Sequence, residues 1–235
     1  MKLIDRNTAI SDNEFASFLS GWQRVGDPAD NEALEAGNYF DEATNEVRFF
    51  TQEELDNIRQ RELNDIQQLL DVKLEIDVPV TATLVIDNPS DVESIDYFTN
   101  LLVDFRSYSY LRLIFIPFYK TNWFNDSVIE THHPDVRTAY TRFKGVIGLD
   151  DYTGGIVISS ETDFRKFLPL YFTLVEGNYI PRGFFYSEEL RSVLSYHASG
   201  ELWFYCFSTT DLERIESYIR SNQLTLNEKY TWCNS

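Results

Sequence analysis

Three residues in the segment THHPD carry the ligand types of a metal site. They are His132, His133 and Asp135, and imidazole with carboxylate is a common ligand set for zinc and iron. Adjacent histidines on a strand point to opposite faces, whereas two-histidine metal motifs place their ligands four residues apart on a helix. The spacing therefore favours a surface loop with two polar histidines over a metal centre.

The segment GLDDYTGG supplies a second candidate, the adjacent carboxylates Asp150 and Asp151. Paired carboxylates bind Mg²⁺ or share a proton. A hairpin turn also selects Asp and Gly for backbone reasons alone, and we expect that role here. The two candidates together define one alternative function, a metal-dependent hydrolase that uses His132 and His133 with Asp135 or with the Asp150–Asp151 pair.

No motif of a nucleophilic enzyme is present. Cys206 lies among aromatic residues in LWFYCFS, with no adjacent base to activate its thiol. The serine-nucleophile, phosphate-loop and dinucleotide-binding glycine patterns are absent. Two cysteines, Cys206 and Cys233, make neither a disulfide framework nor a four-ligand zinc site. We predict no catalytic residue, no resident metal and no cofactor.

The charge of the chain is strongly acidic and unevenly distributed. The formal net charge is −18, and residues 1–100 hold 22 acidic and 7 basic residues, a net charge of −15. A nucleic-acid binder needs the opposite sign because it neutralises phosphates, and an anionic membrane repels the same charge. The sign therefore disfavours both and favours a basic protein partner. A role of the charge in solubility alone stays open as an alternative.

A cluster of aromatic residues lies in the segment FRSYSYLRLIFIPFYKTNWF, residues 105–124. Strand alternation accounts for the burial of some of them. Tyr119, Trp123 and Phe124 fall in a predicted loop, and Tyr and Trp are enriched at protein interfaces. We predict that these three contact a partner; a second hydrophobic cluster beneath a long loop is the open alternative.

A short pattern recurs three times, in PSDVESIDYF from Pro89, ETDFRKFLPLYF from Glu161 and STTDLERIESYI from Ser208. Each copy has a hydroxyl residue, an aspartate and then an apolar helical period, which predicts a helix with a hydroxyl N-cap at Ser90, Thr162 or Thr210. The loops before the helices lack the glycines of a phosphate cradle. The pattern therefore indicates strand–turn–helix units and not a binding site.

The spacing of apolar residues predicts the remaining elements. Helices are expected over residues 10–22, 51–70, 90–105, 134–144, 162–175, 187–196 and 210–221. Strands are expected over residues 46–50, 78–87, 111–118, 182–186 and 201–207, with a hairpin formed by GVIGL and GIVIS. The expected fold class is α/β or α+β, a mixed β-sheet with helices packed on it.

We expect a single compact domain over residues 1–235. It consists of an acidic N-terminal helical region at about residues 1–75, a strand–helix core at about 76–222 and an irregular tail at 223–235. The start of the sequence does not read as a signal peptide, and no apolar run reaches the roughly 18 residues of a membrane helix. A cytoplasmic location is expected.

The acidic, aromatic-rich composition without catalytic motifs resembles that of immunity proteins that neutralise toxin effectors and of other small protein inhibitors. The resemblance implies a non-enzymatic binding module that occludes a basic toxin or effector protein. A DNA-mimic protein is a further alternative, although the acidic residues between 27 and 65 show no regular period. The oligomeric state stays open. The predicted partner contacts are Glu32, Glu35, Asp41, Glu42, Glu46, Glu53, Glu54, Tyr119, Trp123 and Phe124.

Overall fold

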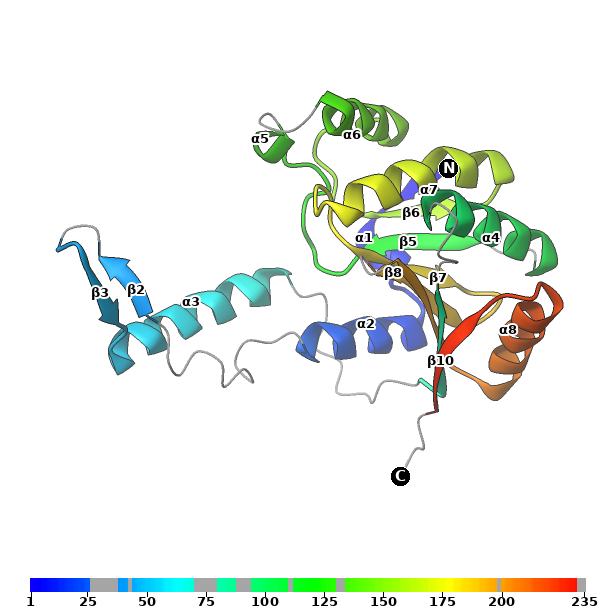
Figure 1. The fold of residues 1–235 in the computed structure, drawn as a ribbon, viewed down its shortest axis with the longest axis horizontal. Helices are drawn as coiled ribbons and strands as arrows, with labels where there is room; N and C mark the ends of the chain where they lie inside the picture. The colour runs from blue at the N-terminus through cyan, green and yellow to red at the C-terminus, as the bar shows by residue number, and fades with distance from the viewer. Residues whose placement is uncertain are drawn as a thin grey trace.

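A computed structural model describes residues 1–25, 38–41, 44–69, 80–87, 94–109, 112–129, 134–197 and 200–231. Eight strands in this part of the chain form one sheet in the order β1–β6–β5–β7–β8–β9–β4–β10 (Figure 1). Their bounds are β1 (Lys2–Ile4), β4 (Ala82–Asp87), β5 (Leu113–Pro117), β6 (Gly155–Ile158), β7 (Gly183–Ser187), β8 (Ser192–His197), β9 (Glu201–Cys206) and β10 (Leu226–Thr231).

Helices cover both faces of this sheet, which confirms the predicted fold class. On one face lie α1 (Arg6–Ala9) and α2 (Asn13–Val25). On the other lie α4 (Ser94–Ser109), the short α5 (Asp126–Ile129), α6 (Pro134–Ile147), α7 (Glu161–Glu176) and α8 (Thr209–Ser221). A separate two-stranded ribbon, β2 (Asn38–Asp41) and β3 (Glu46–Phe49), precedes α3 (Gln52–Leu69).

The sheet is antiparallel at every described pairing, so the expected mixed pairing is corrected. The connection β6–α7–β7 explains the difference. Its two strands run in the same direction, but they are not neighbours. Strand β5 lies between them and pairs antiparallel with both.

The strands are apolar on both faces because both faces are buried. In β5, Phe115 packs with Phe167 and Tyr171 of α7, whereas Ile114 and Ile116 pack on the face of α1 and α2. None of these three β5 residues is more than 4% exposed. A strand without polar alternation is what a doubly covered sheet requires, and β5 confirms the strand predicted over residues 111–118.

Hydroxyl residues do cap α7 and α8, but each cap lies two positions before the residue predicted from the recurring pattern. The caps of α7 and α8 are Ser160 and Ser208, and not Thr162 and Thr210. The Ser160 Oγ accepts a hydrogen bond from Asp163 N at 3.1 Å, and the Ser208 Oγ accepts one from Asp211 N at 3.2 Å. The pattern is therefore helix-initiating, and its third copy, Ser90 and Asp91, lies outside the described residues.

Three predicted elements are corrected. Residues 187–196 form no helix, because the Ser187 Oγ caps only a turn, by accepting a hydrogen bond from Leu190 N at 3.2 Å, and strand β8 follows. GVIGL forms no strand, because α6 continues to Ile147 and Gly148, with φ of 78°, ends it. The expected irregular tail contains β10, which forms the edge of the sheet beside β4.

Two buried tyrosines on opposite faces of the sheet test the role of hydrogen bonds in the core. The Tyr205 hydroxyl has no hydrogen-bond partner in the described part of the chain, whereas the Tyr218 hydroxyl donates to Leu101 O at 3.1 Å. We expect Tyr205→Phe to raise the free energy of unfolding by up to about 1 kcal/mol and Tyr218→Phe to lower it by about 1 kcal/mol. Urea denaturation measures both, and an equal loss in the two variants would contradict this account.

Candidate functional site

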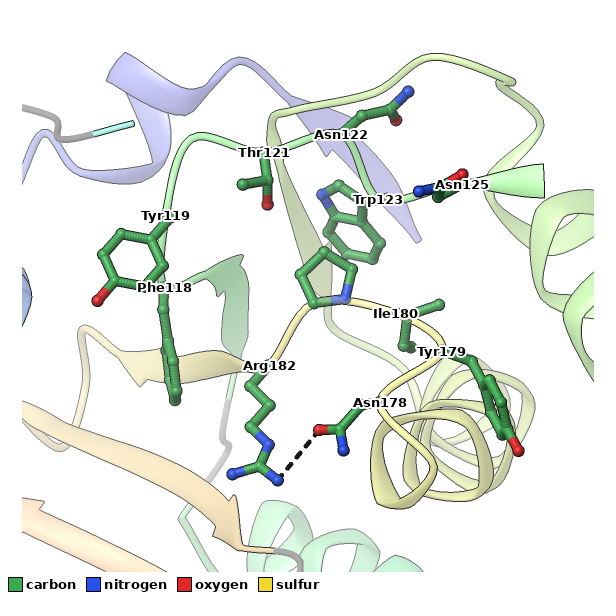
Figure 2. Close-up of a pocket in the computed structure, with 11 residues that line it drawn as sticks. Phe118, Tyr119, Thr121, Asn122, Trp123, Asn125, Asn178, Tyr179, Ile180 and Arg182 are labelled. Carbon is green, nitrogen blue, oxygen red and sulfur yellow. Dashed lines mark hydrogen bonds between the residues drawn. The ribbon is translucent and has the colours of Figure 1, made fainter. Parts of the chain in front are cut away.

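A cavity of about 430 Å³ opens where β5 ends and β7 begins (Figure 2). Two segments form it, the loop of residues 118–125 after β5 and the turn of residues 178–182 between α7 and β7. Phe118 and Tyr119 lie on one side of the view, and Trp123 and Ile180 lie on the other. The antiparallel pairing of β5 with β7 brings the two segments together.

Trp123 fixes the path of the first segment. Its ring is 1% exposed and its centroid lies 5.0 Å from that of Phe115 in the sheet. Its Nε1 donates to Gly154 O at 3.0 Å, and its backbone N donates to Tyr152 O at 2.8 Å. The neighbouring Asn122 Oδ1 accepts from Tyr152 N at 3.1 Å. This side of the cavity is therefore held by packing and by hydrogen bonds to the segment before β6.

The second segment is fixed by the end of α7. Asn178 adopts the left-handed conformation, with φ of 57°, and its backbone N donates to Val175 O at 3.1 Å. Its side-chain Oδ1 accepts from Arg182 Nη2 at 3.1 Å (Figure 2). The Arg182 carbonyl accepts from Phe118 N at 2.9 Å, which ties the two segments together.

The structure corrects the predicted role of the loop aromatics. Trp123 and Phe124 are 1% and 5% exposed, so they belong to the core and cannot serve as surface anchors in this arrangement. Phe124 packs against Tyr140 and Phe143 of α6. Only Tyr119 is partly exposed, at the cavity. The cluster beneath the loop, which the sequence left open as an alternative, describes the other two.

The predicted acidic contacts fall partly on the ribbon and α3. Glu46, Glu53 and Glu54 are exposed. Glu54 also forms a capping box with Thr51, because its Oε2 accepts from Thr51 N at 2.7 Å, and hydrogen bonds from Thr51 lower the pKa of its carboxyl. The backbone of Asp41 lies in β2. The side chain of Asp41 and the whole of residues Glu32, Glu35 and Glu42 lie outside the described part.

Sequence reasoning missed an exposed apolar pair on β3. Val47 is 61% exposed and Phe49 is 72% exposed. They are two residues apart on one strand and so share one face of the ribbon. The alternation in EVRFF carried this signal. What the sequence did not show is that no described element covers that face.

Of the carboxylates predicted for the alternative metal site, that of Asp150 is paired with a lysine. Lys144 Nζ lies 3.0 Å from carboxylate oxygens of both Asp126 and Asp150, which raises the pKa of the lysine. Asp135 and Asp151 are exposed. Among the described residues, no group of three or more His, Cys, Asp or Glu side chains is arranged to hold a metal ion. His132 and His133 lie outside the described residues, so the histidine half of that alternative stays a prediction.

Cys206 is a core residue. It is 0% exposed in β9, and burial raises the pKa of its thiol to about 12. A thiol with so high a pKa is a poor nucleophile at neutral pH. The structure therefore agrees with the expectation of a structural cysteine here; Cys233 lies outside the described part.

A polar pair, His197 and Glu201, lies at the end of the β8–β9 hairpin, close enough to Arg182 for its charge to act on the histidine. The His197 ring stacks on Trp203 with centroids 4.4 Å apart, and His197 lies opposite Glu201 across the strands. Burial lowers the pKa of His197, the nearby charge of Arg182 lowers it further, and the Glu201 carboxylate opposes both. His197 is therefore held in its neutral form at neutral pH.

Comparison of the chain with protein-family models, with curated proteins and with solved structures gives no significant match. None of the described helices combines the length and the apolar composition needed to cross a bilayer. Function is therefore inferred from the geometry and charge of the described residues.

The lowered pKa of His197 predicts a pH dependence of stability. The folded protein binds fewer protons at this site than the unfolded chain, whose histidine has the ordinary value of 6.5. The free energy of unfolding should therefore fall, relative to that of His197→Gln, as the pH drops below about 6.5. Urea denaturation of both proteins between about pH 5 and pH 8 measures the difference. The other two histidines are present in both proteins, so their contributions to the pH dependence cancel. Parallel pH profiles would contradict the assignment.

Proposed function

We propose that this chain is a non-enzymatic protein-binding module, an acidic inhibitor of the immunity type that neutralises a basic toxin or effector protein by occlusion. The observation that supports it is the exposed pair Val47 and Phe49 on an acidic ribbon. Exposed large apolar side chains that adjoin one another mark interaction surfaces. Aromatic residues are the usual anchors at the centre of such surfaces.

The ribbon itself favours a partner. An isolated two-stranded ribbon is marginally stable in water. In the described part of the chain, β2 and β3 pair only with each other, so each also has an unpaired edge. Burying the Phe49 side chain against a partner would contribute about 1.5–3 kcal/mol. A bound protein would thus stabilise the ribbon and cover its apolar face at once.

The surrounding charge selects the chemistry of the partner. Residues 38–69 contain 8 acidic and 3 basic residues, a net charge of −5. Glu53 is exposed in the first turn of α3. On β3, Glu46 and Arg48 alternate with the apolar pair and share the opposite face of the ribbon. Such a surface attracts a basic protein and repels an acidic one. If the partner acts on an anionic substrate, these carboxylates would occupy the positions of the substrate's negative groups.

The test is affinity capture from native cells with three proteins: the unchanged chain, the double variant Val47→Ser/Phe49→Ser, and the control Leu149→Ser. Leu149 is a 43% exposed apolar residue just after α6, outside the ribbon. We expect one stoichiometric basic protein on the unchanged chain and the control, and its loss on the double variant. It should elute between about 0.1 M and 1 M salt, where the Debye length falls from about 10 Å to about 3 Å.

If the double variant captured the partner as well as the unchanged chain does, the ribbon would not be the binding surface. If the salt concentration had no effect on elution, the electrostatic part of the proposal would be wrong. Capture of no partner at any salt concentration would overturn the whole proposal. Far-UV circular dichroism of the variants shows whether they keep the fold. Both ribbon residues are exposed, so the substitutions leave the eight-stranded core intact.

A further inference from the structure

Arg182 lines the cavity without a carboxylate partner. Its Nη2 donates to the neutral side chain of Asn178 at 3.1 Å, and no described carboxylate lies within ion-pair distance of it. A guanidinium has five N–H donors, so most of them stay available. Some described bases of this acidic protein, such as Lys144, Arg165 and Arg191, are paired with carboxylates. Arg182 is not, and it is the basic residue among those that line the cavity.

The Arg182 side chain is exposed, and one hydrogen bond to Asn178 orients its guanidinium. The Asn178 side chain that fixes it belongs to a residue locked at the end of α7, and the Arg182 backbone is locked by the hydrogen bond from Phe118 N. The exposed groups around it are amides and not acids, since Asn122, Asn125 and Asn178 line the same cavity. An arginine oriented in advance loses less entropy when it binds a planar anion.

The remaining walls of the cavity are apolar and include flat rings. Phe118, Tyr119 and Trp123 line it together with Ile180 and Pro181. Figure 2 shows Phe118 near Arg182, with Trp123 and Ile180 across the cavity. A volume of about 430 Å³ lies within the range of small-molecule sites. Small-molecule sites typically combine apolar walls with a few polar or charged groups that point into the cavity.

Among the described residues, no acidic side chain lines the cavity, and the acidic residues at this end of the sheet lie elsewhere. Glu201, opposite His197 on the neighbouring hairpin, accepts a hydrogen bond from Trp203 Nε1 at 3.0 Å, Asp87 lies opposite Glu201 on β4, and Glu176 accepts a hydrogen bond from the Tyr196 hydroxyl. His197, which feels the charge of Arg182, is neutral at neutral pH. The charge that faces the cavity is therefore that of Arg182.

We propose that this cavity binds an anion in which a short aliphatic spacer joins a carboxylate to an aromatic ring. Arg182 pairs with the carboxylate, and the apolar walls cover the ring. The ligand is either a free acid of this type or the carboxyl terminus of a peptide that ends in an aromatic residue, because both present the same chemistry. The site is separate from the ribbon and does not rest on the function proposed for it.

The test uses phenylacetate and its neutral analogue phenylacetamide, with binding measured by saturation-transfer NMR and titration at about 0.15 M salt. The proteins are the unchanged chain, Arg182→Gln, and the control Lys120→Gln. Lys120 is exposed on the same loop but does not line the cavity, so the control changes the net charge equally. We expect the unchanged chain to bind phenylacetate at least about fivefold more tightly than phenylacetamide. The affinity for phenylacetate should fall by a similar factor in Arg182→Gln and stay the same in Lys120→Gln.

A third probe, acetyl-Ala-Ala-Phe, distinguishes the two sources. Binding about tenfold tighter than that of phenylacetate assigns the site to a peptide terminus, and equal or weaker binding assigns it to a free acid. Equal affinity for the acid and the amide, an unchanged affinity in Arg182→Gln, or no binding of any probe at about 10 mM would overturn the proposal. The comparison of acid and amide uses only the unchanged protein, so it stands even if a variant fails to fold.

Discussion

The aromatic contacts of Phe115 are the interaction on which the arrangement of this protein depends. The ring centroid of Phe115 lies 4.7 Å from that of Tyr171 in α7, 4.8 Å from that of Phe185 in β7 and 5.0 Å from that of Trp123 in the loop after β5. All four side chains are at most 1% exposed. Aromatic pairs of this kind stabilise by about 0.5–1.5 kcal/mol beyond the area they bury. One residue thus holds a sheet, a helix and a loop together, and the cavity lies where these meet.

The sequence predicted elements whose causes are local, and it failed where distant contacts decide. The capping box of Thr51 and Glu54 and the doubly apolar strand β5 follow from residues next to one another. The structure of residues 192–197 is instead determined by distant contacts. Ser187 looks like a helix cap, but pairing with β7 and β9 on both sides makes this segment a strand. Strand β10 forms only because β4 presents an edge for it.

The same limit governs the candidate surfaces. The sequence placed Trp123 and Phe124 on a loop, and it could not show that Phe115 and Phe143 come from elsewhere to bury them. Val47 and Phe49 show the reverse, since their alternation is that of a covered strand and no described element covers them. Arg182 and Asn178 are four residues apart in a turn, and only the geometry shows that the amide orients the guanidinium. Burial and exposure of apolar residues are long-range properties, and here they separate core from surface where pattern alone does not.

The charge distribution allows two surfaces of opposite sign on one chain. Residues 101–235 hold 16 acidic and 13 basic residues, so the segment that contains Arg182 is nearly neutral, and the excess of negative charge belongs to residues 1–100. At physiological salt the Debye length is about 8 Å, so an exposed charge is felt mainly by its close neighbours. The amides around Arg182 therefore matter more to an anion in the cavity than the net charge of −18 does. By the same reasoning, the carboxylates of Glu46 and Glu53 act on a partner only where it lies close to them, and so the exposed apolar pair of β3 determines which face of the ribbon it covers.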